Sequence, residues 1–148
     1  MRDFSIIVPH RGSALGLWAT IHSCEEDLAN VRINGVAADF GNRSKYDYEY
    51  VIVTNGERLE IDALGTLHHL REGKKLVHKH YAEAVTPPVA WQRAVEMSSG
   101  KRLFFFDNHC LVGRQYFDRA MLDMDAEGMD MLHSTTAYYS DQAKHYHY

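Results

Sequence analysis

The sequence predicts a single α/β domain with a mostly parallel central sheet flanked by helices. Short apolar runs rich in β-branched and aromatic residues alternate with stretches whose apolar residues recur at helical spacing. This alternation is typical of β-α-β units, whose strands are parallel and whose crossovers are right-handed. The chain has 148 residues, 45% of them hydrophobic, which suits one core. We therefore expect one domain over residues 1–148, with a flexible tail over 141–148.

The first half of the chain predicts two strands and two helices. A buried strand is expected at Phe4–Pro9, because the run FSIIVP is apolar and ends at a proline. A helix follows at Ala14–Ala29, where the apolar residues fall on one face. The second strand, Tyr48–Thr54, ends at an Asn-Gly turn, and a second helix is expected over 57–72 before a glycine.

The second half continues the alternation of strands and helices. A weak strand is expected at Lys75–Lys79, followed by a helix at Val89–Ser98 that begins after two prolines. Leu103–Phe106 is the most apolar strand of the chain, and its three phenylalanines are predicted to lie in the core. The last elements expected are a helix at Tyr116–Met124 and a partly alternating strand at Met129–Tyr139.

Charge and cysteine content restrict the class of protein. The formal net charge of −4 argues against non-specific electrostatic binding of nucleic acid or acidic lipid. No stretch approaches the roughly 18 apolar residues of a membrane span, and the N-terminus has no signal-peptide pattern, so a cytoplasmic protein is expected. Cys24 and Cys110 are too few for a disulfide framework, and both are predicted to be reduced, buried thiols.

Ligands of parallel α/β sheets bind outside the carboxyl ends of the strands. The chemistry is therefore expected at residues 9–12, 54–57 and 107–109. His78 and His80 lie two residues apart in a predicted strand, so they point to the same face. That pair could chelate a metal ion or form a solvated strand edge.

Three segments carry a family resemblance. Ser5–Pro9 (SIIVP) matches a first strand of the form S-I-I-V-P, and Tyr50–Glu57 (YVIVTNGE) matches I-I-V-V-D-D-G-S. Ala90–His109 matches a helix, glycine, apolar strand and terminal D-x-D in the right order and spacing. These motifs resemble the donor-binding half of GT-A glycosyltransferases, in particular the large inverting group. The resemblance implies a Rossmann-like GT-A fold that binds a nucleotide-sugar.

Carried over position by position, the resemblance implies a set of donor-site residues. The nucleotide-sugar would be bound by Pro9, His10, Arg11, Asn55, Gln92, Arg93, Asp107 and Asn108. Asp107 and His109 would hold Mn²⁺ or Mg²⁺, with a further ligand from His133, His145 or His147. Two departures stand out: Thr54-Asn55 replaces the usual aspartates, and His109 replaces the second aspartate of D-x-D. Asp107 could instead cap a turn after its strand.

The function expected from the resemblance is hexosyltransferase-like transfer of a sugar from a nucleoside-diphosphate sugar to a hydroxyl acceptor. A divalent metal would assist departure of the diphosphate. No catalytic base is recognisable, and the acceptor half would come from a partner subunit or from oligomerisation. Two alternatives stay open: a catalytically inactive nucleotide or sugar-nucleotide binding module, and a structural protein on the same scaffold.

Overall fold

The computed structural model describes residues 2–10, 14–29, 44–56, 68, 70, 75–107, 110–113, 115–127, 138–140 and 145–147. The chain divides into two compact units, Met1–Gln115 and Tyr116–Tyr148. The larger unit contains a sheet with helices, and the smaller one contains a helix and a pair of short strands. The single domain expected over 1–148 stays a prediction.

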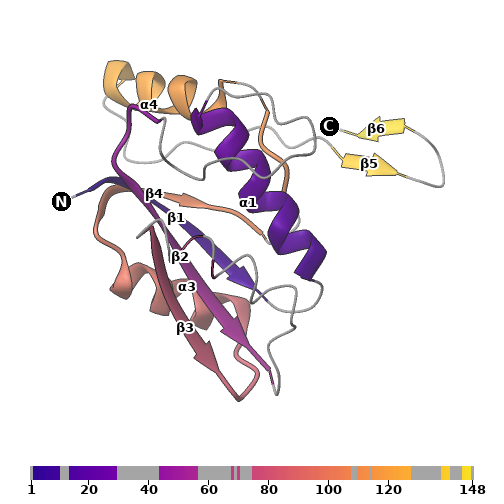
Figure 1. Ribbon diagram of the computed structural model, residues 1–148. Coiled ribbons are helices and arrows are strands. Elements are labelled where there is room, and N and C mark those ends of the chain that lie inside the picture. Colours follow the sequence, from indigo (N-terminus) through magenta and orange to yellow (C-terminus); the bar gives the residue numbers. More distant parts are fainter. Residues whose placement is uncertain are drawn as a thin grey trace. The chain divides into compact units, whose positions relative to one another are not determined.

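The larger unit is built on a four-stranded sheet in the order β3-β2-β1-β4 (Figure 1). Its strands are β1 (Arg2–His10), β2 (Tyr48–Asn55), β3 (Leu76–Tyr81) and β4 (Gly100–Phe105). All three pairings are parallel, which confirms the predicted α/β architecture. The two central strands are the most deeply buried, in keeping with their continuous apolar runs.

Helices α1 (Ala14–Ala29) and α3 (Pro87–Met97) cover opposite faces of this sheet. Ala90 and Ala94 of α3 pack into a buried cluster with the odd-numbered side chains of β1 and β2, such as Ile7 and Val51. The even-numbered side chains of both strands point the other way, toward α1, where the hydroxyl of Tyr48 reaches Glu25. Small alanines let α3 approach the sheet closely.

An aromatic layer fills the α1 side of the sheet near the amino ends of the strands. The rings of Phe4 and Tyr48 stack at 5.5 Å, and Phe104 meets Phe4 edge-on at 5.1 Å. Tyr48 in turn meets Tyr50 edge-on at 5.9 Å. Stacked and edge-on pairs of this kind add to the free energy of burial.

A buried carboxylate lies against this aromatic layer. Tyr48 donates a hydrogen bond of 2.5 Å to Oε2 of Glu25, which is itself fully buried. Burial raises the pKa of Tyr48 and of Tyr50 far above the usual 10.0, and the negative charge of Glu25 raises both further. The ammonium group of Lys75 lies 3.8 Å from the centre of the Tyr48 ring, and burial lowers its pKa.

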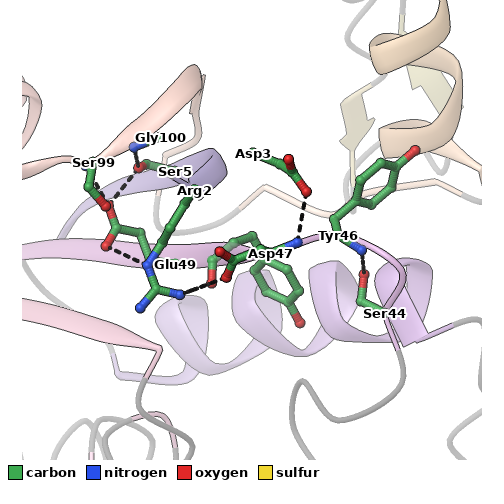
Figure 2. A network of polar contacts seen from close by, with 10 residues as sticks. Arg2, Asp3, Ser5, Ser44, Tyr46, Asp47, Glu49, Ser99 and Gly100 are labelled. Carbon is green, nitrogen blue, oxygen red and sulfur yellow. Dashed lines mark hydrogen bonds and ion pairs between the residues drawn. The ribbon is translucent and has the colours of Figure 1, made fainter.

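A second buried carboxylate ties together the amino ends of three strands (Figure 2). Oε1 of Glu49 accepts hydrogen bonds from the Ser5 hydroxyl at 2.7 Å, the Ser99 amide at 2.7 Å and the Ser99 hydroxyl at 2.9 Å. Its Oε2 lies 3.3 Å from Nε of Arg2. The Ser5 hydroxyl also accepts from the amide of Gly100 at 2.8 Å. This network fixes where β4 begins relative to β1 and β2.

The phenylalanine-rich strand corrects one prediction. Phe104 and Phe106 are buried, but Phe105 is 47% exposed because alternation turns it to the opposite face. Trp91 of α3 is 37% exposed and lies 5.9 Å from Phe105, ring centre to ring centre. Cys24 is buried as expected, whereas Cys110 is only half-buried. Both thiols are free.

The smaller unit contains α4 (Tyr116–Glu127) and the antiparallel strands β5 (Tyr138–Ser140) and β6 (His145–His147). Helix α4 confirms the helix predicted from Tyr116. Strand β6 falls within the stretch expected to be a flexible tail. The predicted helix over 57–72 and most of the strand Met129–Tyr139 lie outside the described residues. None of the helices in the described ranges has the length and apolar character that crossing a bilayer requires.

Candidate functional site

The carboxyl ends of the strands bring several of the predicted residues side by side. The parallel register places His10 of β1 next to Thr54 of β2, and Thr54 next to His80 of β3. One position further on, Asn55 pairs with Tyr81. The chain after β4 continues along β1, since the amide of Phe106 donates to the carbonyl of Ile7 at 3.0 Å.

Side-chain alternation divides this carboxyl edge into two halves. His10, Thr54 and His80 are in register, so they share the α1 face of the sheet. Asn55 and Tyr81 lie on the α3 face, where Tyr81 packs against the core cluster beneath α3. The residues predicted to form one site therefore belong to two surfaces that meet at the end of the sheet.

On the α3 side, Asn55 presents an unused acceptor. Its side-chain oxygen Oδ1 is buried and has no hydrogen-bond partner within the described part of the chain. A buried carbonyl oxygen without a donor costs about 1–3 kcal/mol, so such an atom marks a place where a donor is expected. Beside it, the guanidinium of Arg93 lies 4.1 Å from the centre of the Tyr81 ring. This contact holds a positive charge near the edge.

On the α1 side, Thr54 is the centre of a small polar network. Its Oγ1 lies 2.7 Å from Nε2 of His78 and 2.8 Å from Nδ1 of His80. The other ring nitrogen of His80 lies 3.1 Å from the carbonyl oxygen of Gly56. Gly56 has a φ of 119°, a conformation that favours glycine, and its amide donates to the Tyr81 carbonyl at 3.0 Å.

Asp107 directly follows β4 and its side chain is exposed. Its backbone carbonyl accepts from the amide of Cys110 at 3.2 Å and from the Thr20 hydroxyl at 3.4 Å, which holds the chain against α1. Burial raises the pKa of Cys110, a hydrogen bond with the backbone of Asp107 partly offsets this, and the negative charge of Asp107 adds to the rise. The backbone of Asp107 thus closes a turn, while its carboxylate faces water at the end of the strand.

The other predicted residues are placed less centrally. Gln92 lies on the exposed surface of α3, where its amide is 3.5 Å from Oε1 of Glu96. His145 and His147 belong to β6 in the smaller unit. Arg11, Asn108, His109 and His133 lie outside the described residues. Within the described ranges, no group of three or more His, Cys, Asp or Glu side chains is placed to hold a metal ion.

Sequence reasoning placed Thr54 in the expected site but missed Tyr81, and it did not foresee that Thr54 contacts two histidines. The strand period did predict that His78 and His80 share a face, and their common contact with Thr54 confirms it. Predicting that Thr54 contacts these histidines needed the register between β2 and β3, which no short-range pattern specifies.

The parallel four-stranded sheet with its flanking helices is a Rossmann-like α/β fold. Its fold is similar to that of S. aureus TarS. The crystal structure of TarS residues 1–349 matches with a TM-score of 0.63 and 16% identity, over 85% of this chain and 33% of that one. A second TarS structure matches with a TM-score of 0.62 and 16% identity, over 85% of this chain and 20% of that one. No protein-family model and no curated protein matches the sequence.

Proposed function

We propose that this chain binds a nucleoside-diphosphate sugar at the carboxyl edge of its sheet and transfers the sugar to a hydroxyl acceptor. The similarity of fold to TarS, a glycosyltransferase, supports glycosyl transfer. This chain spans a third or less of those TarS chains. In this proposal the acceptor half comes from a partner subunit or a second copy, and the transfer is inverting, as in the GT-A enzymes that the motifs resemble.

The single observation that carries the proposal is the buried, unused Oδ1 of Asn55. A nucleobase such as uracil or guanine has a ring N–H that can donate to this oxygen. The amide nitrogen of Asn55 can in turn donate to a neighbouring base carbonyl, so one side chain matches both groups. Asn55 would thereby take the position of an aspartate in the family pattern without adding negative charge beside a diphosphate.

The diphosphate needs positive charge when it leaves with its developing negative charge. Arg93 can supply it, because its guanidinium lies over the ring of Tyr81, the register partner of Asn55. The exposed carboxylate of Asp107 is a suitable oxygen ligand for Mn²⁺ or Mg²⁺, with His109 as its proposed companion. When bound, such an ion would neutralise charge on the diphosphate. Pro9, His10, Arg11, Gln92 and Asn108 complete the proposed donor site.

The test is calorimetric titration of UDP, GDP and their sugars into the full chain, with and without Mn²⁺, followed by a donor-hydrolysis assay. Asn55→Ala should weaken nucleotide binding about tenfold, the loss expected for one hydrogen bond to a buried group. Glu96→Gln, an exposed change on α3, is the matched control and should bind like the parent. Asp107→Ala should remove only the metal-dependent part of the affinity.

The alternatives give different outcomes. Binding that depends on Asn55, without donor hydrolysis, would indicate a sugar-nucleotide binding module on the same fold. No binding of any nucleotide, with or without metal, would contradict the proposal and leave a structural role.

A further inference from the structure

Two imidazole nitrogens converge on one point at the α1 side of the carboxyl edge. Nε2 of His78 and Nδ1 of His80 both lie within 2.8 Å of the Thr54 hydroxyl oxygen. The two histidines alternate with Lys79 along β3, so their side chains leave the same face of the strand. Register with β2 then puts Thr54 directly opposite them.

The hydrogen bond to Gly56 determines which ring nitrogen of His80 carries a proton. The Gly56 carbonyl can only accept, so Nε2 of His80 carries the proton at this 3.1 Å contact. In the neutral ring, Nδ1 therefore presents its lone pair toward Thr54. The hydroxyl of Thr54 donates to that lone pair and accepts from Nε2–H of His78. A histidine whose far nitrogen donates to a backbone carbonyl is oriented as metal-binding histidines usually are.

We propose that His78 and His80 form a site for a borderline divalent cation, of the class of Zn²⁺, Ni²⁺ or Cu²⁺. Both rings would bind as neutral ligands, with His80 using Nδ1 and His78 using Nε2 after its proton moves to Nδ1. Water can complete the coordination, because His80 is exposed and His78 is half-buried. The pair contains no carboxylate, so ions that prefer oxygen ligands, such as Mg²⁺, are poorly matched to it.

The two nitrogens already meet at one atom, as the donors to a single ion must. Zinc–nitrogen bonds of about 2.0–2.1 Å in a tetrahedral site place two donor atoms about 3.3 Å apart. The present contacts of 2.7 and 2.8 Å are those of hydrogen bonds to Thr54. To hold one ion together, the two nitrogens would exchange these hydrogen bonds for bonds to the ion. The site is separate from Asp107 and does not depend on sugar transfer.

Binding of an ion here should also stabilise the β2–β3 edge. Both histidines lie on β3, while Thr54 and Gly56 belong to β2 and its turn. An ion that binds the folded state alone raises the midpoint of thermal unfolding with its concentration. This gives a measurement that needs no enzymatic activity.

The experiment uses the full chain with His145→Gln, His147→Gln and Cys110→Ser as the parent, since these residues offer a second His-x-His pair and a half-buried thiol. Zn²⁺ and Cu²⁺ are each titrated by calorimetry. One equivalent should bind, Cu²⁺ more tightly than Zn²⁺, and each ion should raise the unfolding midpoint. His78→Gln and His80→Gln should each weaken binding at least tenfold. His22→Gln, which changes a histidine stacked on Trp18 in α1, should bind like the parent.

Two further results keep the test decisive if a histidine variant misfolds. Electron paramagnetic resonance of the Cu²⁺-loaded parent should show two coordinated imidazole nitrogens. Thr54→Val removes the hydroxyl but neither nitrogen, so it should keep the affinity within about threefold. Fewer than two coordinated imidazoles, or affinity that survives in both histidine variants, would overturn the proposal.

Discussion

Replacing Glu49 with glutamine tests whether the buried carboxylate network stabilises the sheet. The change keeps the shape of the side chain but removes its charge. An amide oxygen can still accept from Ser5 and from both donors of Ser99, as Oε1 does at 2.7–2.9 Å. The amide nitrogen, however, then replaces Oε2 and turns N–H groups toward Nε of Arg2, 3.3 Å away. Flipping the amide would place its nitrogen against the Ser99 amide instead.

The expected cost follows from these contacts. A hydrogen bond to a charged group is worth about 1 kcal/mol more than a neutral one, and three such bonds to Oε1 would become neutral. The contact with Arg2 adds little, since that side chain is 32% exposed and solvent screens it. Glu49→Gln should therefore lower the free energy of unfolding by about 3 kcal/mol.

Urea denaturation at pH 7, followed by circular dichroism, measures this difference. Glu96→Gln is the matched control, because Glu96 is exposed and accepts a long hydrogen bond of 3.5 Å from Gln92. The control should change stability by less than about 0.5 kcal/mol. A Glu49→Gln variant as stable as the control would refute the view that this carboxylate holds the amino ends together.

Two other predictions concern the same unit. Gly100→Ala should lower the free energy of unfolding by about 1–3 kcal/mol in urea denaturation, because the added Cβ would lie 2.3 Å from the backbone nitrogen of Ser5. Gly113→Ala is the control, since a Cβ there meets no atom within 4 Å. The stability of the fold should fall as pH rises above about 10, because Tyr48 and Tyr50 have raised pKa values in the folded state and ionise first in the unfolded chain. Urea midpoints at increasing pH measure how steeply stability falls with pH, and Tyr48→Phe should reduce that slope.

The elements that sequence patterns predicted well are those whose signal is local. The run FSIIVP and the helical spacing after Ser13 correspond to β1 and α1, because burial on both faces or on one stripe leaves a period in the sequence. Phe105 shows the limit of that signal. An edge strand such as β4 is covered less than a central one, so an unbroken aromatic run does not imply that every ring is buried.

The polar groups were harder to predict, since their partners are distant in sequence. Glu49 interrupts an apolar run, and nothing near it indicates that Ser5 and Ser99 would satisfy its carboxylate. The same holds for Thr54, whose histidine partners come from the next strand. Such contacts are fixed by register between strands, which short-range patterns do not encode.

Thr54 and Asn55, at the end of β2, stand where the glycosyltransferase pattern that the sequence resembles has aspartates. Side-chain alternation gives these two departures different consequences. Thr54 and Asn55 are adjacent in sequence but face opposite sides of the sheet, so one ligand cannot use both side chains in the same way. Thr54 is already engaged by two imidazoles, whereas the oxygen of Asn55 is buried without a donor in the described chain. The proposed contact of Asn55 with a nucleobase therefore lies on the α3 side, whereas the proposed ion site of His78 and His80 lies on the α1 side. A change at one of these residues should leave the other function intact.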